Sequence, residues 1–236
     1  MARSLYVEPE PRAQEVEWPA LELIDVFRIY RSGPVETVAL RGLDLRVEPG
    51  EFLAVLGPSG GGKSTMLALA AGLDSPSAGE VRAFGRSLPR MGESELAAYR
   101  AQEVAIVFQS DNLWSALSAQ ENVEISLRLG DCANPEGAAA ALEAFGLGER
   151  RAHRAAELSG GEQQRVAIAA AAARNARLVL ADEPTGELDR RNEQVVLDAL
   201  ARLQREHGAT VIVVTHSAKI ASSAGRVVEL RDGRVV

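Results

Sequence analysis

Two short stretches hold residues whose types and spacing suit phosphate chemistry. The first is GPSGGGKST, residues 57–65, which follows an apolar run and opens a run of helix-forming residues. The second is LVLADEPTGELD, residues 178–189, where four apolar residues lead into Asp182 and Glu183. Burying an unpaired carboxylate is costly or shifts its pKa, so this acidic pair requires a cation or another partner.

The first stretch fits the phosphate-loop pattern G-x-x-x-x-G-K-[ST], in which glycines let backbone N–H groups and a helix N-terminus surround an anion. We predict that Lys63 reaches the β- and γ-phosphates of a nucleotide and that Ser64 binds Mg²⁺. The alternative is an ordinary glycine-rich turn, which the order of strand, loop and helix disfavours. The predicted nucleotide-binding residues of this loop are Gly57, Pro58, Ser59, Gly60, Gly61, Gly62, Lys63, Ser64 and Thr65.

The second stretch supplies the acids that such a loop needs. In phosphate-loop proteins, the acid that ends a second apolar strand lies beside the Mg²⁺. We therefore predict that Asp182 is a metal ligand and that Glu183 faces the water that attacks the γ-phosphate. The alternative is a helix N-cap or a buried salt bridge, which accounts for one acid but not for the pair.

Bulk properties restrict the partners of the chain. With 236 residues, a formal net charge of −7 and a pI near 5.2, the chain has no overall field that would attract nucleic acid, and we expect no such partner. A single cysteine excludes an internal disulfide and favours a reducing compartment. No run approaches the roughly 20 apolar residues that span a bilayer. Lysine occurs at only two positions, Lys63 and Lys219.

The order of patterns predicts an α/β fold. Buried strands that alternate with helices indicate a phosphate-loop core with a parallel sheet. An antiparallel β subdomain precedes the loop, and an inserted, mostly helical subdomain covers about 93–157. We expect a disordered tail over 1–20 and one domain over 21–236. The predicted elements are antiparallel strands and then a buried strand in 21–56, helices at 63–72, 160–175 and 189–206, strands at 105–109, 178–182 and 210–216, and a final hairpin that turns at Asp232 and Gly233.

A third motif narrows the class. LSGGEQQ, residues 158–164, resembles the signature of the nucleotide-binding subunits of ABC transporters, and the resemblance runs from about residue 21 to the end. It implies two subunits closed head to tail over two ATP molecules. Ser159, Gly160 and Gly161 would bind the γ-phosphate held by the opposite subunit, and Asp189 would lie in the loop that crosses the interface. The alternative for Ser159 is a simple helix cap, and both roles are compatible.

The resemblance also assigns three residues outside these motifs. It implies that Tyr30 stacks on adenine, that Gln109 contacts Mg²⁺ and the attacking water, and that His216 contacts the γ-phosphate. The alternatives are an ordinary strand aromatic, a polar strand end and a structural histidine. The chain departs from the family pattern at Gly61, where many members have serine, and at Glu162, where many have glutamine. Neither change removes a catalytic group, so we expect ATP hydrolysis.

The resemblance further implies an integral membrane permease subunit on a separate chain, which places this chain in the cytoplasm, peripheral on the inner face of the cell membrane. Residues 109–127 would form a groove for that subunit, lined by Leu113, Trp114, Leu117 and Val123; the alternative is that these are core residues of the helical subdomain.

The stretches GPSG, GLDSPSAGEV and VFQSDNLWSALSAQENV, and a chain end without the extension usual in sugar importers, are similar to a subgroup of lipoprotein-releasing, macrolide- or peptide-exporting and cell-division ATPases. We therefore expect an exporter or extractor. One alternative is a cell-division-type ATPase that signals without transport. Another is an ABC protein that acts on nucleic acid or ribosomes, which the acidic charge disfavours.

Overall fold

A central, mostly parallel sheet forms the middle of the computed structural model, which describes residues 18–33, 35–130, 136–186 and 188–236. Its strand order is β10-β9-β3-β8-β7-β6, with β10 antiparallel to β9 and the other neighbours parallel. The strands are β3 (Phe52–Leu56), β6 (Val104–Val107), β7 (Leu178–Asp182), β8 (Thr210–Thr215), β9 (Arg226–Arg231) and β10 (Arg234–Val235).

Both faces of this sheet are buried, which explains the continuous apolar runs in its strands. Successive side chains point to opposite faces, so Leu178 and Leu180 of β7 pack in one hydrophobic cluster while Val179 and Ala181 pack in the other. Since all four are fully buried, β7 holds its last residue, Asp182, in a fixed position at the carboxyl end of the sheet.

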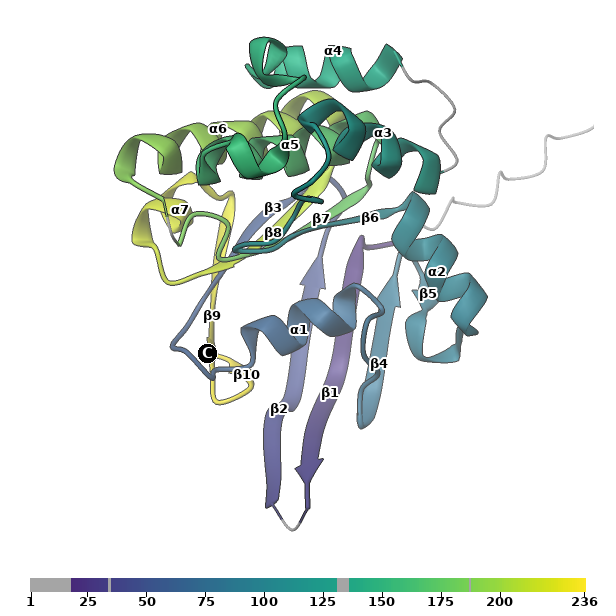
Figure 1. Cartoon of the computed structure of the whole chain (residues 1–236). Coiled ribbons are helices and arrows are strands. Elements are labelled where there is room, and N and C mark those ends of the chain that lie inside the picture. The colour runs from purple at the N-terminus through teal and green to yellow at the C-terminus, as the bar shows by residue number, and fades with distance from the viewer. Residues whose placement is uncertain (1–17, 34, 131–135, 187) are drawn as a thin grey trace, which may run out of the picture.

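A second, antiparallel sheet with order β2-β1-β4-β5 lies below the central sheet in Figure 1, with helix α1 between the two. Met66 and Leu69 of α1 are buried in the same cluster as Leu21 of β1 and Leu40 of β2. The elements are β1 (Leu21–Ser32), β2 (Val35–Val47), α1 (Lys63–Ala70), β4 (Ala78–Ala83) and β5 (Arg86–Ser87).

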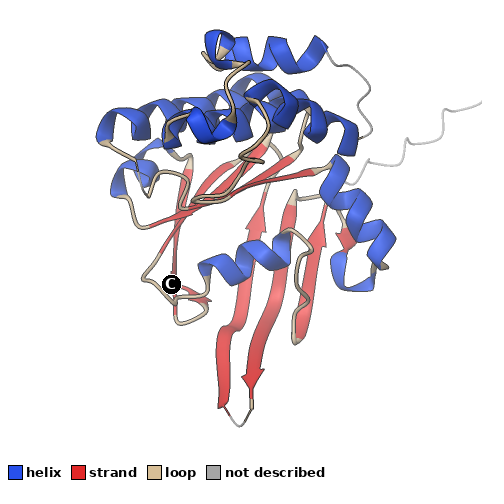
Figure 2. Cartoon of the chain, viewed as in Figure 1, coloured by secondary structure: helices blue, strands red, loops and turns tan. Residues whose placement is uncertain are grey.

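Helices cover the other face of the central sheet (Figure 2). α5 packs against α3, α4 and α6, and buried side chains from these helices form the second cluster. The helices are α2 (Glu93–Gln102), α3 (Ala119–Leu129), α4 (Glu136–Ala144), α5 (Gly160–Ala173), α6 (Arg190–His207) and α7 (Ala218–Ser223), with short 3-10 turns η1 (Leu88–Arg90), η2 (Gly148–Arg150) and η3 (Ala155–Glu157).

The predicted α/β class is confirmed, and most predicted elements lie within two residues of their observed bounds. The strand predicted at 105–109 is shifted, because β6 ends at Val107 and leaves Gln109 in the following loop. The sequence reading also missed β4, β5 and α7. Within the predicted helical subdomain, β6 belongs to the central sheet and α2 contributes the buried Tyr99 to the cluster around α1.

The predicted tail lies almost entirely outside the described residues, which begin at Trp18. Ala20 is fully buried, and its carbonyl accepts a hydrogen bond from the Phe84 N–H. In the described residues, no helix is both long and apolar enough to cross a membrane.

Candidate functional site

The loop of residues 57–62 joins β3 to α1 and is shaped by close backbone contacts that glycine alone permits. A Cβ on Gly57 would lie 2.1 Å from the Leu230 carbonyl oxygen of β9. Gly62 has a φ of +99°, and a Cβ there would lie 2.6 Å from the Ala39 carbonyl oxygen. The Gly233 N–H donates to the Gly61 carbonyl, so the turn of the β9–β10 hairpin is hydrogen-bonded to the loop.

Lys63, the first residue of α1, turns its ammonium back over the loop. Its Nζ donates to the carbonyl oxygens of Gly57 at 2.8 Å and Pro58 at 3.0 Å. Gly62, the N-cap residue of α1, provides no side-chain cap, and the first turn of the helix has no acidic residue. The first N–H groups of α1 and the Lys63 ammonium therefore present a concentrated positive potential, which suits a phosphate group.

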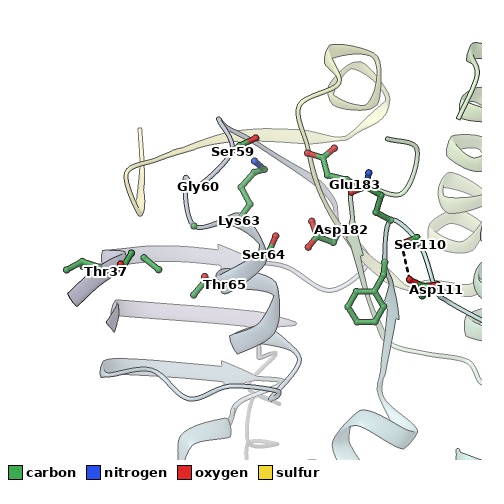
Figure 3. A pocket seen from close by; sticks show the side chains of 15 residues that line it. Thr37, Ser59, Gly60, Lys63, Ser64, Thr65, Ser110, Asp111, Asp182 and Glu183 are labelled. Atoms are coloured by element: carbon green, nitrogen blue, oxygen red, sulfur yellow. Dashed lines mark hydrogen bonds between the residues drawn. The ribbon is translucent and has the colours of Figure 1, made fainter. Parts of the chain in front are cut away.

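Figure 3 shows Asp182 and Glu183 across from Lys63 and Ser64, in a cavity of about 760 Å³. The loop and the acidic pair, far apart in the sequence, therefore meet in one place. The residues that line it are Thr37, Val38, Ala39, Ser59, Gly60, Gly62, Lys63, Ser64, Thr65, Phe108, Gln109, Ser110, Asp111, Asp182 and Glu183.

Three of the lining residues were predicted to bind Mg²⁺, namely Ser64, Gln109 and Asp182. They bring a hydroxyl, an amide carbonyl and a carboxylate to one cavity. Oxygen ligands of this kind, few in number and beside a phosphate site, are what Mg²⁺ binds in proteins. The donor set therefore fits this ion.

Glu183 has a φ of +45°, which a residue of its size rarely adopts. Its N–H donates to the Val214 carbonyl of β8 at 3.0 Å, and its carboxylate turns toward the end of that strand. Oε1 lies 3.0 Å from His216 Nδ1, and Oε2 accepts a hydrogen bond from the Thr215 hydroxyl. The predicted base and the predicted γ-phosphate histidine are thus in direct contact.

The signature residues lie outside this cavity. Ser159 caps α5, where its hydroxyl accepts from the Glu162 N–H and the Glu162 carboxylate accepts from the Ser159 N–H. Burial opposes ionisation of Glu162, but the hydrogen bonds from Ser159 and the contact with Arg150 hold its pKa below the ordinary value. Gly160 and Gly161 form the first turn of α5. None of these three predicted residues lines the cavity that holds Lys63.

Asp189 caps α6 in the same manner as Ser159 caps α5. Its Oδ1 accepts from the N–H groups of Arg191 and Asn192, and the hydrogen bond from the Asn192 backbone is the main reason that the pKa of Asp189 is lowered. The carboxylate is exposed, and it too lies outside the cavity lining.

Tyr30 stands opposite Thr37 in the β1–β2 register, and Thr37 lines the cavity. The Tyr30 hydroxyl donates to Asp74, and the Arg28 guanidinium lies 4.5 Å from the ring centroid. Tyr30 is half-exposed but is not itself in the cavity lining. It is therefore held beside the predicted nucleotide site, and stacking on adenine stays a prediction.

A second hollow, of about 670 Å³, follows the loop after β6 and is lined by Leu113, Trp114 and Leu117 among others. The Trp114 side chain is 68 % exposed. Val123, which was predicted to line the same groove, is fully buried in the helical core. For Val123 the alternative of a core residue is correct, because its position on α3 faces inward.

Two residues that contact the predicted site residues were missed by the sequence reading. Gln164 of α5 is 4 % exposed, and its Nε2 donates to the carbonyl oxygens of Phe108 and Gln109. Thr215, at the end of β8, contacts Glu183 as described above. The signal for Gln164 was available, since a polar residue on the inner face of a helix requires a buried partner.

The fold and the cavity together define a phosphate-loop ATPase. A family model described as ABC transporter matches residues 40–186. The lipoprotein-releasing system ATP-binding protein LolD of Geobacter metallireducens is 43% identical over 219 residues, which cover 92% of this chain and 97% of that protein. The chain therefore belongs to the ABC transporter family, as one of its ATP-binding ATPase domains.

Two further similarities agree. The macrolide export ATP-binding/permease protein MacB of Azoarcus sp. is 44% identical over 221 residues, which cover 92% of this chain but only 34% of that protein, so the chain spans about a third of the MacB relatives that it matches. Among solved structures, the ATP-binding cassette MJ0796, a dimer in a post-hydrolysis state bound to ADP and Pi, has a TM-score of 0.84 and 37% identity, with 91% of this chain and 96% of that chain covered.

Proposed function

We propose that two copies of the chain close head to tail over two ATP molecules and that ATP hydrolysis drives a separate integral membrane subunit. That subunit would be an exporter or an extractor of lipoproteins or peptides, with the chain docked on the inner face of the cell membrane. The observation that carries the proposal is the division of the site. Lys63, Asp182 and Glu183 share one cavity, while Ser159 and its glycines lie outside it.

Head-to-tail pairing would bring the two parts together. The N-terminus of α5 in one copy would close over the phosphates that the other copy holds at Lys63. The exposed Asp189 loop would lie in the same interface. Two facing helix N-termini would share the charge of each triphosphate, so nucleotide binding would favour closure. The dimeric form of the similar MJ0796 cassette supports this arrangement.

Within each closed site, the residues of the chain have separate roles. Backbone N–H groups of the loop and Lys63 bind the phosphates, and Tyr30 stacks on adenine. Ser64, Asp182 and Gln109 would hold Mg²⁺, which when bound neutralises phosphate charge.

Hydrolysis transfers the γ-phosphoryl group to water. The water oxygen forms a bond to the γ-phosphorus, the bond from that phosphorus to the β-γ bridging oxygen breaks, and ADP leaves with the electron pair. Glu183 accepts the water proton, while Gln109 orients the water and His216 contacts the γ-phosphate. Positioning and electrostatics supply most of the rate, so closure itself would assemble the catalyst.

The groove at Trp114 is the proposed contact with the membrane subunit. LolD and MacB are named for lipoprotein release and macrolide export, and these names support a membrane partner of the same kind. Trp114 is largely exposed beside a hollow that includes Leu113 and Leu117, and large aromatic side chains in such hollows often carry much of the binding energy. The contact would lie directly after Gln109, so it could sense the state of the ATP site.

The test uses a tagged Glu183→Gln chain, expressed in its native host and purified from gently solubilised membranes with ATP and Mg²⁺. We expect an integral membrane protein in stoichiometric amount. Trp114→Ala in the same background should lose it, whereas Trp18→Ala, which alters the other tryptophan, should retain it.

Other outcomes would redirect the proposal. Co-purification of division-machinery proteins would favour the signalling ATPase. Recovery of ribosomes, nucleic acid or nothing, from a chain that still forms the ATP-bound dimer, would refute a membrane partner.

A further inference from the structure

The parallel pairing of β7 and β8 brings Glu183 beside a buried hydroxyl. Asp182, the last residue of β7, pairs with Val214, so the residues that follow them in the chain, Glu183 and Thr215, are neighbours. Thr215 is 1 % exposed, and its Oγ1 lies 3.0 Å from Glu183 Oε2. A buried hydroxyl requires a partner, and here the partner is the carboxylate of the proposed base.

A second hydrogen bond agrees with donation by the Thr215 hydroxyl. The Ser217 N–H donates to Thr215 Oγ1 at 3.0 Å and occupies a lone pair of that oxygen. The single proton of the hydroxyl is therefore left to donate to Glu183 Oε2. An ionised carboxylate can only accept, so Thr215 is the donor to the ionised carboxylate of Glu183.

Ser217 is itself held in place from the other side. Its hydroxyl donates to Glu193 Oε1 at 3.0 Å, and Lys219 Nζ donates to Glu193 Oε2 at 3.1 Å. Glu193 lies in the first turn of α6. The loop after β8 is thus tied to α6, which keeps the Ser217 N–H directed at Thr215.

We propose that Thr215 is a positioning residue for ATP hydrolysis. It holds Oε2 of Glu183 from the buried side, so that Oε1, which faces His216 Nδ1, is the oxygen that receives the proton of the attacking water. The backbone of Glu183, with a φ of +45°, is not held in that conformation by its own preference, so it depends on its contacts with β8, at the Val214 carbonyl and the Thr215 hydroxyl. The inference rests on the proposed role of Glu183 as the base.

The same strand supplies a matched control. β8 begins with Thr210, which is also 1 % exposed and whose hydroxyl accepts from the Gly50 N–H at 3.0 Å. Thr210 lies at the opposite end of the strand from Glu183 and touches none of the proposed site residues. The change from threonine to valine removes a hydroxyl from either position with little change of shape, so a merely structural effect would be alike in both variants.

The experiment compares kcat and KM for ATP in the full chain with Mg²⁺, with thermal unfolding as a check on folding. Thr215→Val should lower kcat by about 10- to 100-fold, as expected for loss of a hydrogen bond to a charged group, with little change in KM. Thr210→Val should keep kcat within about twofold. Thr215→Ser, which restores the hydroxyl, should recover most of the rate. If the valine variant does not fold, Thr215→Ala replaces it.

Equal kcat values in the Thr215→Val and Thr210→Val variants, or no recovery with Thr215→Ser, would overturn the inference. Glu183→Gln in the same assay separates it from the proposed function. Normal turnover of Glu183→Gln would refute the base itself. Loss of turnover in Glu183→Gln together with normal turnover in Thr215→Val would refute only the positioning role.

Discussion

The phosphate loop and the signature turn, residues 158–161, each end in a helix N-terminus, but the surroundings of these two N-termini differ. The N-terminus of α1 has no side-chain cap, and it faces a cavity that also holds Asp182 and Glu183. The N-terminus of α5 is capped by Ser159 and lies outside that cavity. The first half-site, at Lys63, is assembled within one chain, whereas in the proposed dimer the second half-site, at Ser159, would act on the nucleotide held by another copy. ATP binding and ATP hydrolysis should therefore be separable by substitutions.

Glu183→Gln should give the largest effect on turnover. Glutamine keeps the shape of the side chain but cannot accept a proton, so kcat should fall by about 10²- to 10⁴-fold. ATP affinity should change little, because Lys63 and the loop are intact, and closed dimers should accumulate. Phosphate release, ATP titration and size-exclusion chromatography measure these quantities. Glu206→Gln, on an exposed i,i+4 pair with Arg202, is the control; turnover near the wild-type rate in Glu183→Gln would remove Glu183 as the base.

The two lysines offer the next comparison. Lys63→Ala removes an ammonium from the phosphate site and should weaken ATP binding by about 10- to 100-fold, as expected for loss of a charged hydrogen bond. Lys219 is bound to Glu193 outside the cavity, so Lys219→Ala should leave ATP affinity unchanged. Equilibrium titration with ATP and Mg²⁺ gives both values. Equal affinities in the two variants would contradict the phosphate role of Lys63.

Mixing two chains that are each impaired in one half-site tests whether the half-sites belong to different copies. Ser159→Glu adds a negative charge that a helix N-terminus tolerates but that should repel a triphosphate held by a partner. A mixture of Lys63→Ala and Ser159→Glu chains should regain activity, because each mixed dimer contains one intact composite site. With random pairing, about a quarter of the wild-type rate is expected. A mixture no more active than its components would show that the composite site does not form.

The same comparison explains what the sequence could predict. The loop, Lys63 and the acidic pair were predictable, because local spacing of residues dictates the strand, the turn and the helix that carry them. The meeting of Gly57 with the Leu230 carbonyl, and of Glu183 with Thr215, depends on which strands become neighbours in the sheet, and no local pattern encodes that. The end of β6 was predicted two residues too late. β6 is an apolar strand at the edge of the central sheet, and its residues contain no local signal that ends the strand at Val107. Val123 was predicted to line the groove because the sequence does not show whether an apolar helix residue packs in the core of its own chain or against a partner.

Two adjacent glutamines on α5 allow the phosphate-loop region and the Ser159 region to be perturbed separately, with the smallest expected effects. Gln164 donates to the Phe108 and Gln109 carbonyls on the phosphate-loop side. Gln163 makes the same type of bonds to the Ala155 and Leu158 carbonyls, directly before Ser159. Leucine at either position removes two hydrogen bonds, at a cost of about 1–3 kcal/mol in unfolding free energy. One carbonyl of each pair keeps a second donor, because Asn112 Nδ2 donates to the Phe108 carbonyl and the Leu158 N–H to the Ala155 carbonyl.

The functional effects of the two leucine variants should nevertheless differ. Gln164→Leu removes the hydrogen bond to the Gln109 carbonyl and should lower kcat about three- to tenfold, with normal dimer formation. Gln163→Leu should loosen the signature turn and raise, by a similar factor, the chain concentration needed for ATP-dependent dimers, with normal ATP binding by the single chain. Phosphate release at high chain concentration and sedimentation in the Glu183→Gln background separate the two. If both variants lost the same property, α5 would act as one rigid unit, and the half-sites would not be held independently.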